Sequence, residues 1–136
     1  IQLDQKDYQV MQKLYNNDYS PELEEELLLL EKLKMGFIVR SKQAEALAKS
    51  IEGSPYPVVV CGDFNDTPSS YAYQIIRAEL KDAFVESGNG MGRTYNGKFP
   101  SFRIDYILHS PAIEVLDFKV HPLELSDHYP LSVYLK

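Results

Sequence analysis

The apolar residues of this chain change their spacing once, close to Gly53, and that change limits the folds open to it. Before Gly53, apolar side chains recur every three or four residues and no strand pattern occurs, which predicts helix. After it, short β-branched runs alternate with loops, which predicts strands. The sequence therefore predicts a helical segment over residues 1–52 and a strand-rich segment over residues 53–136, within one domain of mixed α and β structure.

The helical segment contains two predicted helices separated by a break. Residues 4–15 carry apolar or aromatic side chains at helical spacing, and residues 16–21 interrupt the pattern. Ser20 is a good N-cap and Pro21 suits a first helical turn, so the second helix is predicted to begin there. It extends to Gly53, with a break allowed near Gly36 because the segment is long for one globular helix.

One face of this second helix is apolar. Its members recur at helical spacing and are Leu23, Leu27, Leu30, Leu33, Phe37, Ala44, Leu47 and Ile51. Such patterning favours packing against the sheet of the same domain. A coiled coil or a stripe that binds a partner is the alternative.

The second half alternates strand and helix signals. Apolar and β-branched runs predict strands over residues 57–61, 103–109, 113–120 and 130–135, the first of them buried. Residues 70–80 have the spacing of a helix with one apolar face. The glycine-rich stretch over residues 88–97 predicts a loop.

Charge and cysteine content exclude several classes of protein. The chain has 14 basic and 20 acidic residues, a net charge of −6, which disfavours binding of duplex DNA through bulk electrostatics. Cys61 is the only cysteine, so an internal disulfide and a thiolate metal cluster are ruled out, and we expect an inert core thiol. No apolar run approaches the ~20 residues that a membrane span needs, and no targeting signal is visible, so localisation is not predicted.

Three polar clusters lie at predicted strand ends or in loops beside them. They are residues 62–66 (Gly-Asp-Phe-Asn-Asp), 103–108 (Arg-Ile-Asp-Tyr-Ile-Leu) and 126–130 (Ser-Asp-His-Tyr-Pro). Because loops at one end of a sheet lie side by side, clusters far apart in sequence can converge on one site. For the first cluster alone, a simple turn is the more common interpretation.

Asp105 and His128 suggest a functional pair. Asp105 lies within an apolar strand, where an unpaired charge would cost several kcal/mol, so it needs an arginine or a histidine as partner. A carboxylate beside His128 would orient the imidazole and raise its basicity. Asp127 supplies the hard oxygen that Mg²⁺ prefers, whereas His109, at a strand end, is expected at the surface. Together these residues could catalyse phosphoester hydrolysis.

These motifs resemble a known family. Residues 62–65, 103–108 and 126–131 are similar, in order, to the three C-terminal motifs of the endonuclease/exonuclease/phosphatase superfamily, which has the deoxyribonuclease-I-like fold. The match covers about residues 55–136, with a weaker one over residues 40–51. It implies the C-terminal half of a four-layer α/β/β/α sandwich, an α+β fold with a mixed, mostly antiparallel sheet.

The resemblance also implies roles for five residues. Asp63 would orient or deprotonate the attacking water, and Asn65 would bind the scissile phosphate. Asp105 would support His128, and His128 would contact and stabilise the phosphate in the transition state. Asp127 would lie at or beside the metal, Mg²⁺ or Mn²⁺.

Three further residues are expected to contact substrate: Arg93, Arg103 and Tyr129. In the family, the region equivalent to residues 87–103 often borders the substrate, although a plain solvated loop is an equally good interpretation. The acidic net charge favours a phosphorylated small molecule or a lipid-like substrate. Nucleic acid is the other possibility within the family.

The chain departs from the family in its N-terminal half. Family members carry further strands there, with an asparagine, the principal metal-binding glutamate and a His-Leu motif, and none of these is present. We therefore expect residues 1–136 to form a single partial catalytic domain with reduced or no activity and an exposed sheet edge. This domain is expected to associate with another copy or with its missing half. The alternative is a non-catalytic binding module that uses the leucine-rich helix face.

Overall fold

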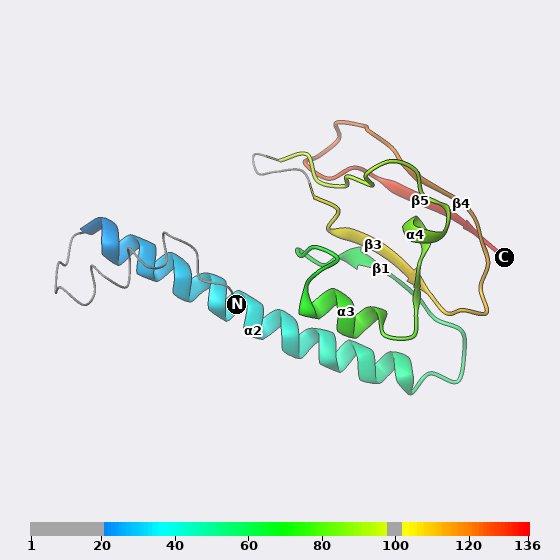
Figure 1. Cartoon of the computed structure of the whole chain (residues 1–136), viewed down its shortest axis with the longest axis horizontal. Helices are drawn as coiled ribbons and strands as arrows, with labels where there is room; N and C mark the ends of the chain where they lie inside the picture. Colours follow the sequence, from blue (N-terminus) through cyan, green and yellow to red (C-terminus); the bar gives the residue numbers. More distant parts are fainter. Residues whose placement is uncertain (1–20, 98–101) are drawn as a thin grey trace. The chain divides into compact units, whose positions relative to one another are not determined.

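The computed structural model describes residues 21–97 and 102–136, and the helix predicted over residues 4–15 lies outside them. The chain divides into two compact units, Ile1–Val39 and Arg40–Lys136. All the strands and all three polar motifs belong to the second unit (Figure 1). None of the described helices combines the length and the apolar character that a membrane crossing needs.

Helix α2 runs from Pro21 to Glu52. Proline is well suited to a first helical turn because the N–H it lacks would have no partner within the helix. The helix continues through Gly36, so the break allowed there does not occur. At its end, the backbone N–H of Gly53 donates to the carbonyl oxygen of Lys49 at 3.0 Å.

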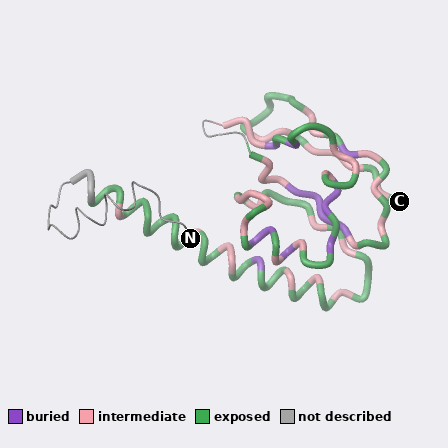
Figure 2. The backbone as a smooth tube through the Cα atoms, in the orientation of Figure 1, coloured by how far each residue is buried: buried purple, intermediate pink, exposed green. Residues whose placement is uncertain are grey.

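The apolar face of α2 is buried only towards its C-terminal end. Leu30, Leu33 and Phe37 of this face are 44, 50 and 53% exposed, and Figure 2 shows the change along the helix. Ala44 is 2% exposed and packs in the core, with Ile51 against it. The part of the face before Arg40 belongs to the other unit, so for that part the packing on the domain's own sheet stays a prediction.

Three strands form the sheet that carries two of the motifs. They are β1 (Val59–Asp63), β2 (Lys81–Asp82) and β3 (Asp105–His109), in the antiparallel order β1-β3-β2. Strands β4 (Val115–Val120) and β5 (Leu131–Leu135) pair separately, also antiparallel. The two sheets and their antiparallel pairing agree with the predicted α+β class.

Strand β1 is exposed, which corrects the prediction of a buried strand. Val59 is 41% exposed, and Cys61, expected to be a core thiol, is also exposed. The reason is that β1 lies at one edge of the described sheet and pairs only with β3. An edge strand leaves one row of backbone groups open to another chain.

Helix α3 (Tyr71–Arg77) contributes three residues, Ala72, Tyr73 and Ile76, to the main hydrophobic core. The side chain of Ser70 caps it by accepting the N–H of Tyr73 at 3.2 Å. Tyr73, Ile76 and Leu80 are buried together, as the helical spacing predicts. The helix ends earlier than predicted because Ala78 adopts a positive φ of 28°, which a helix cannot contain.

Strand β2 and helix α4 (Ala83–Ser87) were not predicted. Asp82 ends β2 and begins α4, because its Oδ1 accepts the N–H of Phe84 at 3.0 Å. A second apolar cluster forms beneath α4, from Ala83, Ile107 and Phe118. An aspartate before a short apolar run is the N-cap signal that would have revealed α4.

Candidate active site

Strands β1 and β3 bring the first two motifs together. Asp63 and Asp105 are register partners at one end of this antiparallel pair, and Val59 and His109 are partners at the other end. The pairing continues past Asp63, since the N–H of Phe64 donates to the carbonyl oxygen of Ile104 at 2.8 Å. Two carboxylates that are 42 residues apart in the sequence therefore share one end of the sheet.

The loop before β5 adds the histidine. Nδ1 of His128 lies 2.9 Å from Oδ2 of Asp105, so the contact expected from the sequence is present. The hydrogen bond to Asp105 raises the pKa of His128 above its usual range, with smaller contributions from the negative charges of Asp105, Asp63 and Asp127 and an opposing effect of partial burial. The imidazole is therefore cationic over a wider pH range than a free histidine.

The loop after β1 is both a turn and part of the site. The N–H of Asn65 donates to Oδ1 of Asp63 at 2.7 Å, and Asn65 has a φ of +50°. Asparagine tolerates this left-handed conformation better than most residues. Both side chains are exposed, so the turn interpretation and the site interpretation describe the same loop.

A tyrosine on β3 forms a hydrogen bond to this loop. The hydroxyl of Tyr106 lies 2.9 Å from the carbonyl oxygen of Asp66 and 2.7 Å from that of Arg103, and its single hydrogen can donate to either. Its ring is 1% exposed and packs against Phe64 and Tyr73. The site loop is therefore held by the hydrophobic core.

The site offers a set of ligand atoms for a cation. One ligand atom from each of Asp63, Asp105 and His128 lies within 4.8 Å of the other two. The two carboxylates fit a divalent cation because they supply hard oxygen donors and no thiolate is included. The protonated His128 would lie beside such a cation and would not bind it, because a ligating imidazole must be neutral. Asp127 is exposed and is not a member of this cluster, so its role as a metal ligand stays a prediction.

Two of the predicted substrate residues lie beside His128. Tyr129 follows it directly, and the guanidinium of Arg93 lies 6.0 Å from the centre of the Tyr129 ring. Nε of Arg93 donates to the carbonyl oxygen of Tyr95 at 3.2 Å, and the Tyr95 ring meets that of His128 edge-on at 5.1 Å. Arg93 and Tyr129 therefore border the site.

The third predicted substrate residue, Arg103, is occupied elsewhere. Its NH1 lies 2.6 Å from Oδ2 of Asp82, and the two side chains are only 9 and 0% exposed. Its guanidinium also packs over the rings of Phe84 and Tyr106, at 4.8 and 4.7 Å. The structure therefore gives Arg103 a packing role, because the buried Asp82 carboxylate requires a cation, and the expected substrate contact stays a prediction.

His109 also differs from expectation. We expected it at the surface, but it is 0% exposed, and its Nε2 lies 3.2 Å from a carboxylate oxygen of Glu86. Its strand, β3, lies between the other two strands of the described sheet, so both of its edges are paired, and every β3 residue after Asp105 is buried. Sequence position at a strand end does not reveal this.

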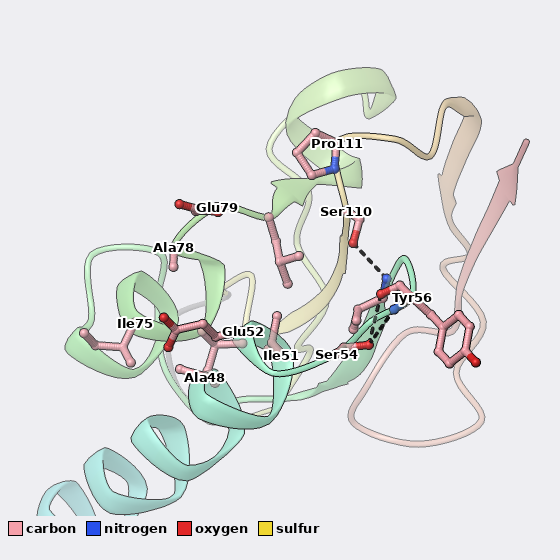
Figure 3. A pocket seen from close by; sticks show the side chains of 13 residues that line it. Ala48, Ile51, Glu52, Ser54, Tyr56, Ile75, Ala78, Glu79, Ser110 and Pro111 are labelled. Carbon is pink, nitrogen blue, oxygen red and sulfur yellow. Dashed lines mark hydrogen bonds between the residues drawn. The ribbon is translucent and has the colours of Figure 1, made fainter.

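Two cavities help to locate the functional end of the sheet. A groove of about 320 Å³ is lined in part by Asp63, Asn65 and Arg40. A second cavity, of about 470 Å³, lies at the other end of β1, between Ile51, Ile75 and Ser110 (Figure 3). None of the residues that line the second cavity belongs to the three motifs. We therefore place the site at the end of the sheet that carries Asp63.

Comparison with known proteins agrees with this geometry. The sequence model of the Endonuclease/Exonuclease/phosphatase family matches residues 37–128, which is more than half of the chain. No curated protein matches the chain at a significant level. A solved endonuclease/exonuclease/phosphatase from Bacteroides vulgatus is 29% identical, with a TM-score of 0.62 over 71% of this chain and 43% of its own.

Two further solved structures are similar. A mannosyl-6-phosphatase from Bacteroides thetaiotaomicron is 25% identical, with a TM-score of 0.56 over 71% of this chain and 45% of its own. A functionally unknown conserved protein from Enterococcus faecalis is 18% identical, with a TM-score of 0.61 over 74% of this chain and 45% of its own. At this identity the likeness shows the fold alone. The chain therefore spans less than half the length of these structures.

Proposed function

The chain belongs to the endonuclease/exonuclease/phosphatase family, and from this premise we propose that its site hydrolyses phosphoesters with the help of a divalent cation. The observation that carries this proposal is the convergence of Asp63, Asp105 and His128 at one end of the sheet. A carboxylate, a cationic imidazole and an amide are the groups that phosphoryl transfer to water requires. The solved mannosyl-6-phosphatase, a similar structure, also supports hydrolase chemistry.

Each side chain has a place in the proposed reaction. The exposed Asp63 carboxylate would orient the attacking water or take its proton, and the Asn65 amide would donate to the phosphate. The raised pKa of His128 keeps its imidazolium charge available to the phosphoryl oxygens. Asp105 maintains that charge and the orientation of the ring through the 2.9 Å contact.

Mg²⁺ or Mn²⁺ is the proposed cation, and Asp127 would lie at or beside it. When bound, such an ion would stabilise the charge that develops on a phosphoryl oxygen. The hard oxygen donors of the site are the chemical reason for this choice.

The proposed substrate is a phosphorylated small molecule or a lipid-like phosphoester. The net charge of −6 works against long duplex DNA, which associates best with a basic surface. Arg93, beside Tyr129, supplies one cation for an anionic headgroup. Nucleic acid is the alternative, and rapid nicking of plasmid DNA would favour it over phosphoinositides or sphingomyelin.

The test is hydrolysis of bis(p-nitrophenyl) phosphate by the full chain, with Mg²⁺, Mn²⁺ or EDTA. We expect hydrolysis that requires the metal and falls roughly a hundredfold or more in Asp63→Asn. Asp117→Asn is the matched control, because Asp117 is a surface carboxylate on β4 that pairs with Lys119. An Asp63→Asn variant as active as Asp117→Asn would contradict the proposal. A folded, metal-supplied chain that hydrolyses nothing would mean that residues 1–136 have no activity by themselves, and the proposal would then fail for this chain.

A second candidate function is a binding module without catalysis. It is favoured by the half-exposed Leu28, Leu33 and Phe37 on α2, since large exposed apolar residues often mark interaction surfaces. Under this alternative, Leu33→Glu would abolish association with a partner and leave any hydrolysis unchanged.

A further inference from the structure

Thr94 is buried in a loop. Its side chain is 0% exposed, although it lies in the glycine-rich segment between α4 and β3. A buried hydroxyl must find hydrogen-bond partners within the protein, because its transfer away from water is otherwise unfavourable. The partners of Thr94 therefore indicate what it does.

The hydroxyl of Thr94 contacts the start of β3. Its Oγ1 accepts the backbone N–H of Ile104 at 3.0 Å and that of Asp105 at 3.1 Å. The N–H of Thr94 donates in turn to the carbonyl oxygen of Phe102 at 3.2 Å. The backbone that carries the Asp105 carboxylate is therefore held by one side chain outside the sheet.

The backbone of the same segment contacts the His128 loop. The carbonyl oxygen of Thr94 accepts the N–H of Tyr129 at 2.7 Å. Its neighbour Tyr95 forms an isolated antiparallel bridge with His128, and the two rings meet edge-on. Thr94 therefore bonds to Asp105 through its hydroxyl and to Tyr129, the residue that follows His128, through its carbonyl.

We propose that Thr94 is a positioning residue for the Asp105–His128 pair. The two members of the pair are 23 residues apart, and the 2.9 Å contact between them depends on how β3 and the following loop are placed. Thr94 sets that placement because it bonds to both segments. This inference rests on the proposed function in one respect only, which is the expected effect of a Thr94 substitution on turnover.

The experiment compares two variants of the full chain by nuclear magnetic resonance. Thr94→Val keeps the shape of the side chain and removes the acceptor, and Thr94→Ser keeps the hydroxyl. In Thr94→Val we expect the N–H groups of Ile104 and Asp105 to exchange with solvent roughly tenfold faster or more. The downfield ring N–H signal of His128 should also disappear, and Thr94→Ser should resemble the wild type in both respects.

Ser110→Ala is the matched control. Oγ of Ser110 accepts the N–H of Val58 at 2.8 Å, close to the other end of β3. Its loss should accelerate exchange at Val58 and leave His128 unchanged. The inference is wrong if Thr94→Val and Ser110→Ala show the same His128 ring N–H signal and the same exchange rates at the N–H groups of Ile104 and Asp105.

Two further measurements keep the test decisive. If Thr94→Val does not fold, hydrogen exchange in the wild type is the test. The N–H groups of Ile104 and Asp105 should be protected by their bonds to Thr94, so rapid exchange at both would overturn the inference. In the hydrolysis assay, Thr94→Val should lower kcat about tenfold or more with KM within about twofold. A wild type without turnover contradicts the proposed function, whereas the exchange data judge the role of Thr94 separately.

Discussion

At the scale of single residues, the chemistry of the site depends on the environment of His128. A histidine alone in a loop has an ordinary pKa near ~6.5. Here the carboxylate of Asp105 accepts a hydrogen bond from the ring and raises the pKa of His128. The charge of His128, and with it the free energy of unfolding, therefore depends on pH through this pair.

The first prediction concerns this coupling. Asp105→Asn should lower the pKa of His128 towards its ordinary value, as measured by nuclear magnetic resonance titration of the ring protons. Because the folded-state pKa of His128 is raised, its contribution to stability is fully present below the unfolded-state pKa of ~6.5 and is lost as the pH rises through the folded-state pKa. The difference in unfolding free energy between wild type and variant should therefore be larger at pH 6 than at pH 9.

A pKa of His128 that does not change in Asp105→Asn would contradict this interpretation. Asp117→Asn serves again as the control, since that carboxylate pairs with Lys119 on the surface.

At the scale of elements, α4 and the start of β3 are joined through a buried ion pair. Asp82 caps α4 with Oδ1, while its Oδ2 accepts the Tyr73 hydroxyl at 2.7 Å and the Arg103 guanidinium at 2.6 Å. Desolvation and the hydrogen bond to Asp82 raise the pKa of Tyr73, so the phenol remains a donor. The network fixes the chain just before Asp105.

The second prediction separates this packing role of Arg103 from substrate binding. Arg103→Met should lower the free energy of unfolding by about 3–5 kcal/mol, because it leaves a buried carboxylate without its cation. Urea denaturation measures the effect, and Arg93→Met, on an exposed residue, is the control, expected within about 0.5 kcal/mol of wild type. If Arg103→Met is as stable as wild type and only raises KM, the original substrate assignment is correct.

At the scale of the whole molecule, the chain presents an open sheet edge beside its functional site. Strand β1 carries Asp63 at its end, and within residues 21–97 and 102–136 it pairs on one side only. We propose that this edge associates with a second copy or with a separate chain that supplies the other half of the domain, since the chain covers 43–45% of the structures compared above. Such pairing would also cover the groove next to Asp63.

The third prediction is that the isolated chain self-associates through β1. Cys61→Lys should shift it towards a monomer in light scattering, because a charge on an exposed edge strand opposes pairing. Leu116→Lys, on the exposed side of β4, is the control and should leave association unchanged. A wild type that scatters as a clean monomer of 15.6 kDa would contradict the proposal.

The order of most elements and the positions of the three motifs could be predicted from the amino-acid sequence. Helical and strand periodicities are local properties, so they predicted α3, β3, β4 and β5 from neighbouring residues. The sequence also suggested the Asp105–His128 contact, because a carboxylate within an apolar strand needs an arginine or a histidine as partner, and the family resemblance implied that Asp105 supports His128. The short β2 and α4 were missed because two and five residues are too few to establish a period.

The surroundings of several side chains depend on contacts between segments that are far apart in the sequence. Arg103 pairs with Asp82, Thr94 bonds to Asp105, and His109 is buried. In each case the deciding group lies ten or more residues away and is brought close by strand pairing or by packing of α4. Cys61 is exposed for the converse reason, because an apolar run predicts a strand but cannot show whether both of its edges are paired.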